Sequence, residues 1–151
     1  MNRVVVTGIG ILSPIGNDKA SVAEGLRGGR SGIRRMHEWD NVKGLQSLIG
    51  GEVTGFDPQR IPRPSRRTMG KVALMATIAS DDAVRDAGLA QDYLRSGRAG
   101  LAIGSTTGSP QSMCEFFADF ALKGGIEGQM GTSFMKVMGH SAAAMPRCTW
   151  D

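Results

Sequence analysis

The first apolar run of the chain covers residues 4–12, where valine, isoleucine and leucine recur and no charged residue intervenes. A run that is apolar on both faces is typical of a strand buried in the centre of a covered sheet. Gly8 and Gly10 lie within it, and glycine permits positive φ and the close approach of another backbone. The pattern therefore predicts a buried strand, which Pro14 and Gly16 end.

The next segment, residues 17–26, places apolar residues at helical spacing between charged positions. Asn17 or Asp18 is suited to cap the first turn of this helix, and Gly28 is suited to end it. Residues 34–48 are polar and irregular, so we expect a loop there.

The most regular helical pattern is a stripe of small apolar residues over residues 65–87, most of them alanine. Pro62 and Pro64 disfavour a helix before Ser65, which is the expected N-cap. Gly88 is placed to end the helix in a left-handed conformation. Small side chains along one stripe let a helix pack very close to a neighbour.

The remaining pattern predicts two more strands and a further helix. Residues 48–54 form a short strand weakened by two glycines, and residues 99–103 form a second short buried strand. A turn-rich loop over 104–110 leads into a helix over 111–122, and residues 130–144 are apolar and small. This order of elements predicts an α/β protein with a mixed or parallel sheet covered by helices.

Composition adds limits to this picture. A chain of 151 residues with 40% hydrophobic and 21% charged residues is expected to form one globular domain. Two cysteines without a Cys-x-x-Cys pair argue against a metal site or a disulfide framework, and favour a reducing compartment. We find no signal-peptide pattern and no apolar run long enough to cross a membrane, so we expect a cytoplasmic protein without a membrane partner.

The glycines of the first run do not complete a dinucleotide-binding fingerprint. Gly8 and Gly10 have the right spacing, but Ser13 stands where the third glycine belongs and Pro14 follows it. No acidic residue stands at the end of a clear second strand to hold a ribose. We therefore do not expect a nucleotide site here.

No residue is evidently arranged for nucleophilic catalysis. Residues 139–143 nearly match Gly-x-Ser-x-Gly, but the last glycine is replaced, and the other histidine, His37, lies in a loop. We expect a small-residue turn entering a close-packed helix. Cys114 is expected to be a small buried apolar side chain. Cys148 has no expected base or oxyanion site beside it.

The densest basic cluster lies around the two prolines, and cations at a helix N-terminus oppose the helix dipole, so helix stability does not explain it. A solvated face, a dock for an acidic partner and a nucleic-acid site all remain open. No aromatic residue interleaves with the arginines to stack on bases, which argues against nucleic acid. The cluster consists of Arg60, Arg63, Arg66, Arg67 and Lys71.

Four stretches together resemble the N-terminal part of the β-ketoacyl-[acyl-carrier-protein] synthases of type I and II. They are the first run with its turn, 4–18; the segment Leu-Arg-Gly-Gly-Arg-Ser-Gly-Ile, 26–33; Asp-Ala-Gly-Leu, 86–89; and Gly-Leu-Ala-Ile-Gly-Ser-Thr-Thr-Gly-Ser-Pro, 100–110. They agree with the family in order and spacing, and the resemblance covers residues 1–144.

This resemblance implies the N-terminal part of a thiolase-like fold, in a family that forms homodimers. The family carries out the decarboxylative condensation of an acyl thioester with malonyl-carrier protein during fatty acid synthesis. No metal or organic cofactor is implied. Arg63, Arg66 and Arg67 match the family's basic dock for the acidic acyl carrier protein. Thr107 falls where the family lines or gates its acyl pocket.

The resemblance also implies what residues 1–144 lack. The family's nucleophilic cysteine and its two histidines have no counterpart here, and neither His140 nor Cys148 takes their place. We therefore expect the chain alone to be catalytically inactive; the alternative is a non-catalytic module that binds an acidic acyl carrier protein or a synthase subunit. Residues 145–151 depart from the family pattern, and a one-base frameshift before Met145 is our hypothesis for that change.

Overall fold

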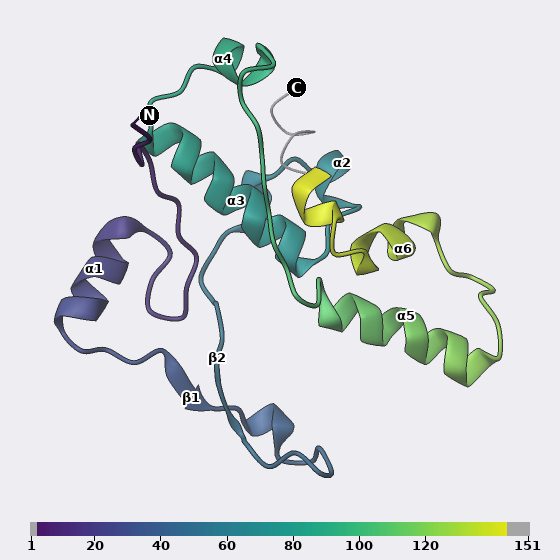
Figure 1. Cartoon of the computed structure of the whole chain (residues 1–151). Helices are drawn as coiled ribbons and strands as arrows, with labels where there is room; N and C mark the ends of the chain where they lie inside the picture. The colour runs from purple at the N-terminus through teal and green to yellow at the C-terminus, as the bar shows by residue number, and fades with distance from the viewer. Residues whose placement is uncertain (1–2, 145–151) are drawn as a thin grey trace.

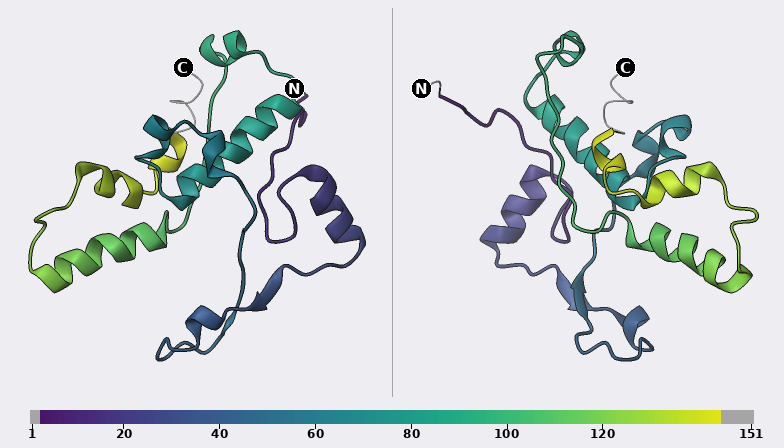
Figure 2. Two further views of the ribbon diagram at one scale, coloured as in Figure 1. Left: turned by 180° about the vertical axis from the view of Figure 1, so that it is seen from behind. Right: turned by 45° about the vertical axis from the view of Figure 1, so that its right-hand side comes forward.

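The computed structural model describes residues 3–144, and helix α3, Lys71–Asp86, lies at its centre. The N-terminal segment and α1 lie on one side of α3, and the α5–α6 pair projects on the other side (Figure 1). The β1–β2 hairpin forms a third arm (Figure 2). The small apolar core around α3 consists of Ile61, Met69, Ala73, Ile78 and Ala142.

The N-terminal segment lies directly on the backbone of α3. A Cβ atom added at Gly10 would lie 1.8 Å from the carbonyl oxygen of Ala79, and one added at Gly8 would lie 2.3 Å from that of Ala83. Neither glycine is among those with positive φ. The close backbone approach that glycine permits is found here, and the backbone that approaches is that of α3, the helix with the small-residue stripe. The space between the backbones, not a special φ, requires glycine at these positions.

Two of the predicted buried strands are not strands in this structure. Residues 3–12 and 99–103 are unpaired, and Val4 and Val6 are 92% and 83% exposed. A strand needs a neighbour whose N–H and C=O groups complete its ladder. Within residues 3–144, neither segment has such a neighbour, so the prediction of buried strands there is wrong for the part of the chain described.

Helix α1, Lys19–Arg27, is capped as predicted. The side chain of Asp18 accepts a hydrogen bond of 2.9 Å from the backbone N–H of Ser21, and the N–H of Gly28 donates to the carbonyl of Glu24 at the other end. These bonds satisfy backbone groups that have no partner inside the helix.

Asp86, the last residue of α3, joins three parts of the fold. Its carboxylate forms an ion pair with Lys19 of α1 and accepts a 2.9 Å hydrogen bond from the backbone N–H of Ile9. Both contacts favour the charged carboxylate, the lysine contact most, and they hold the pKa of Asp86 below its ordinary value. The acidic end of α3 thus holds the N-terminal segment and α1 together.

The two strands of the structure form an antiparallel hairpin. Strand β1, Ile33–Arg35, pairs with β2, Ile49–Gly51, so that Arg34 faces Gly50. Strand β2 lies within the strand predicted over 48–54. Strand β1 and the 3-10 helix η1, His37–Trp39, occupy part of the segment expected to be loop.

In place of the helix predicted from Ser65, the structure has two helices. The N-cap residue of neither helix forms a side-chain capping bond. After the 3-10 helix η2, Pro58–Arg60, the short helix α2 spans Arg63–Arg66 with proline in its first turn, where the missing N–H costs nothing. Helix α3 then begins after Gly70. Ser65 as N-cap was therefore wrong, whereas Gly88 has a φ of +65° as predicted.

The start of α3 is capped from a distant part of the chain. Ser109 is 3% exposed, and its hydroxyl accepts a 3.2 Å hydrogen bond from the backbone N–H of Val72. A Cβ atom at Gly70 would lie 2.2 Å from that hydroxyl oxygen and 2.6 Å from the carbonyl oxygen of Lys136. Three segments therefore meet at Gly70, and only glycine leaves room for them.

The last part of the described chain is helical. It comprises α4, Gln91–Arg95; α5, Pro110–Lys123; and α6, Gly131–Val137. Helix α5 packs on α6, with the rings of Phe116 and Phe134 6.4 Å apart between centroids. Cys114 was predicted to be buried and is exposed, because it lies about 100° around the helix from the half-buried Met113. The tail predicted over 145–151 lies outside the described residues.

The contact at Gly10 predicts a specific loss of stability. We expect Gly10→Ala to lower the free energy of unfolding by about 1–3 kcal/mol, because the added methyl group meets helix backbone that cannot rotate away. Denaturant unfolding followed by circular dichroism measures this. Gly125→Ala is the control, since nothing lies within 4 Å of its added Cβ. An equal loss in both variants would contradict the contact.

The lowered pKa of Asp86 predicts acid sensitivity. A carboxyl with a lower pKa in the folded state stabilises the fold above its unfolded pKa of about 3.9, and that stabilisation is lost as the pH falls through the folded pKa. We expect Asp86→Asn to destabilise the chain at pH 7 but much less at pH 2.5, as measured by unfolding curves at both values. A loss of the same size at both pH values would rule out this charge effect.

Candidate functional site

The predicted docking arginines gather on one short helix. Arg63 begins α2 and is exposed. Arg66, in its last turn, is half-buried, and Arg67, at its C-terminal end, is exposed. The exposed Lys71 follows in the first turn of α3. Within residues 3–144, none of these four side chains forms an ion pair. Their charges are therefore directed to solvent or to a partner, and Lys71 also opposes the dipole of α3.

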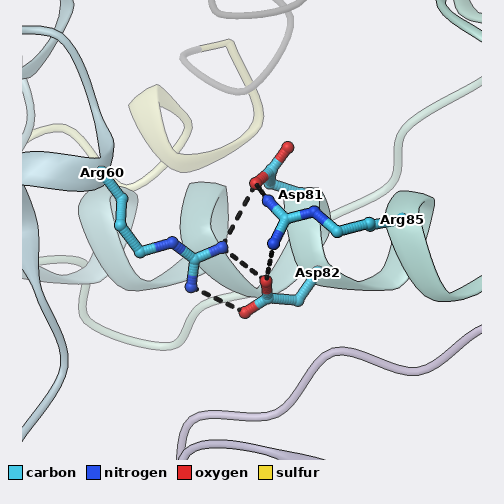
Figure 3. A network of polar contacts seen from close by, with 4 residues as sticks. All are labelled: Arg60, Asp81, Asp82 and Arg85. Carbon is cyan, nitrogen blue, oxygen red and sulfur yellow. Dashed lines mark hydrogen bonds and ion pairs between the residues drawn. The ribbon is translucent and has the colours of Figure 1, made fainter.

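Arg60, the first member of the sequence cluster, has a different role. Its guanidinium hydrogen-bonds both carboxylate oxygens of Asp82, one of them at 2.9 Å, and lies 3.2 Å from a carboxylate oxygen of Asp81 (Figure 3). Arg85 contacts the same carboxylates, with 2.6 Å to Asp81. The hydrogen bond to Asp82 raises the pKa of the Arg60 guanidinium above its ordinary value. Arg60 thus ties η2 to α3 and is not a free cation.

Lys136, which lies beside the segment between α2 and α3, was not identified from the sequence. The half-buried Lys136, in the last turn of α6, has its carbonyl oxygen against Gly70, which lies between Arg67 and Lys71. No pattern in the sequence joins these residues, because the contact is made only when α6 packs on the start of α3. In the part of the chain described, Lys136 also forms no ion pair.

The loop that carries Thr107 is fastened beside the same point. Thr107 is exposed, and its hydroxyl lies 3.4 Å from that of Thr106. The backbone N–H of Gly108 donates a 3.0 Å bond to the hydroxyl of Ser105, and Ser109 then accepts from Val72 at the start of α3. The structure therefore brings the loop of Thr107 next to the start of α3, which closely follows α2 in the sequence.

A separate cavity lies beside α3. It has a volume of about 1000 Å³ and is lined mostly by apolar residues of α3, α4 and the following segment, with His140 among its lining residues. Neither Thr107 nor the α2 arginines line it. The cavity is therefore separate from both sets of predicted site residues.

The other motifs of the sequence serve the fold. Ser141 is 6% exposed and donates a 2.6 Å hydrogen bond to the carbonyl of Met138, as expected for a turn that enters a helix. Residues 141–144 are helical. Among residues 3–144 there is no group of three or more residues that could hold a metal ion, and no helix long and apolar enough to span a membrane. Cys148 lies outside the described residues.

Comparisons with known proteins agree with the resemblance read from the sequence. The family model described as "Beta-ketoacyl synthase, N-terminal domain" matches residues 1–145. The chain is 38% identical over 109 residues to 3-oxoacyl-[acyl-carrier-protein] synthase 1 of Haemophilus influenzae, covering 72% of this chain and 27% of that protein. It is 30% identical over 141 residues to nodulation protein E of Rhizobium meliloti, covering 93% of this chain and 35% of that protein.

A solved structure gives the same result for the fold. A β-ketoacyl synthase of Burkholderia phymatum superposes with a TM-score of 0.87 and 33% identity, covering all of this chain and 37% of that one. The chain thus spans about a quarter to a third of the length of the curated relatives it matches. It has part of the thiolase-like fold of these enzymes, and it belongs to the β-ketoacyl synthase family, whose N-terminal domain it matches.

Proposed function

We propose that this chain is the N-terminal part of a 3-oxoacyl-[acyl-carrier-protein] synthase, an acyltransferase that condenses an acyl thioester with malonyl-carrier protein. Its role within that reaction is to bind the acyl carrier protein through Arg63, Arg66 and Arg67 and to place the loop of Thr107 at the acyl pocket. The relative in Haemophilus influenzae is named for this activity.

One observation carries the proposal for this region. The hydrogen bond between Ser109 and Val72 joins the loop of Thr107 to the start of α3, and α3 closely follows the cationic helix α2 in the sequence. A carrier protein presents its acyl group on a thioester arm, so a docking face must lie near the entrance of the acyl pocket. The bond between the loop of Thr107 and the start of α3, close to α2, supports such an arrangement.

We further propose that the 151-residue chain alone does not catalyse condensation. Acyl transfer by this family's mechanism needs a thiolate with a base beside it. Cys114 lies on α5 and His37 lies on η1, elements on separate arms of the molecule (Figure 1). His140 is exposed and is one of the residues that line the cavity beside α3. These three side chains are on different elements and form no hydrogen bond with one another in the described structure.

We expect the chain alone to be inactive in a condensation assay. The purified chain, supplied with acyl- and malonyl-[acyl-carrier-protein], should release no 3-oxoacyl product above the rate in buffer, as measured by mass spectrometry of the carrier protein. A complete synthase is the positive control. Product that disappears in Cys114→Ala would contradict the proposal and would identify Cys114 as a nucleophile.

The docking prediction concerns charge. We expect Arg67→Glu to weaken binding of acyl carrier protein about 5–20-fold at low salt, because an exposed attraction becomes a repulsion. Fluorescence anisotropy with labelled carrier protein measures the affinity, and circular dichroism checks the fold. Lys43→Glu, an exposed change of the same charge on the hairpin arm, is the control. Equal affinities for Arg67→Glu and the unaltered chain would reject α2 as the dock.

A further inference from the structure

Several basic residues of the chain form ion pairs within the fold. Lys19, Arg60 and Arg85 each pair with carboxylates of α3, and Arg34 and Arg35 each pair with a carboxylate of the hairpin arm. These cations are neutralised within the fold. The cations around Gly70 have no such partner in the described residues, so their charge is available to another molecule.

Lys136 is a fifth basic residue, beside the four at α2 and the start of α3. The backbone of Lys136 contacts Gly70, and one residue after Gly70 comes Lys71. Arg66 and Arg67 precede Gly70 by three or four residues. We call this surface the basic face; it consists of Arg63, Arg66, Arg67, Lys71 and Lys136.

The basic face concentrates cationic residues on segments that meet at Gly70. Its five residues belong to α2 and its C-terminal end, to the first turn of α3 and to the last turn of α6, and Lys71 stands at the positive end of the α3 dipole. An anionic surface is attracted to such a group of cations, and this attraction increases the association rate. Among residues 3–144, the cation–π contact is between Arg98 and Tyr93 and involves none of these five residues. Its chemistry fits an acidic protein better than stacked bases.

We infer that Lys136 docks the acidic acyl carrier protein together with the α2 arginines and Lys71, and that Arg60 takes no part in docking. The inference rests on the proposed function, and it changes the composition of the docking surface. A surface formed by α2 alone is a single short helix. With Lys136 the surface extends onto α6 and borders the point where Ser109 anchors the loop of Thr107.

The test compares four variants of the full chain for binding to labelled acyl carrier protein. We expect Lys136→Glu to weaken binding about 3–10-fold at low salt, as for a charge at the rim of an interface, and to reduce the dependence of affinity on salt. Lys136→Arg should bind as the unaltered chain does. Arg60→Gln should bind normally but unfold at a lower temperature, because Asp82 loses its partner. Lys43→Glu remains the charge control.

The binding results distinguish the role of Lys136 from the proposed docking function as a whole. If Lys136→Glu binds normally while Arg67→Glu binds weakly, the inference about Lys136 is overturned and the proposed docking function stands. If the folded, unaltered chain does not bind carrier protein at low salt, the proposed function itself fails. If a short duplex DNA of similar charge binds as tightly and loses affinity in the same variants, the basic face is a general polyanion surface and the inference is overturned.

Discussion

The close contact between the N-terminal segment and α3 is the constraint on which the placing of α1 against the acidic end of α3 depends. The two glycines bring one backbone against another, and the nearest atoms belong to the small residues Ala79, Ala83 and Ala87. At this distance the segment's N–H groups can reach the end of α3, and Ile9 bonds to Asp86. Asp86 in turn fixes Lys19 and with it α1. A bulkier contact would separate all of these partners.

The opposite end of α3 is organised in a similar way but for a different purpose. Gly70 removes the side chain that would keep Ser109 and Lys136 away, and Ser109 supplies the cap that the helix lacks. The two ends of one helix thus use glycine to admit neighbours. At the Asp86 end the neighbours neutralise one another, whereas at the Gly70 end the cations remain unpaired within the described chain. This difference in charge balance distinguishes the structural end of α3 from the end that we propose meets a partner.

Features with local causes were predictable from the sequence, and features with distant causes were not. The cap at Asp18 and the left-handed turn at Gly88 depend on neighbouring residues, and both were predicted correctly. The strands expected over 3–12 and 99–103 depend on pairing partners, and these do not occur within residues 3–144. The start of α2 was misjudged because proline was taken as a barrier, although the first turn of a helix accepts it.

The candidate site shows the same division. The arginines of α2 are adjacent in sequence, so their clustering could be read directly. The pairing of Arg60 with Asp81 and Asp82 could not be predicted, because Arg60 is about twenty positions from the two aspartates. It meets them only when η2 packs on α3. The position of Lys136 beside Gly70 likewise requires the packed fold.

The glycine contact also has a consequence for synthesis on the ribosome. The segment around Gly10 emerges early, but its docking surface on α3 is complete only at about residue 87. At roughly 5–20 residues per second, the segment of Gly8 and Gly10 waits for about 4–15 seconds before that surface is made. During this interval it is a natural target for chaperones that bind extended apolar chain. The order of translation thus separates the synthesis of this segment from the docking that fixes its position.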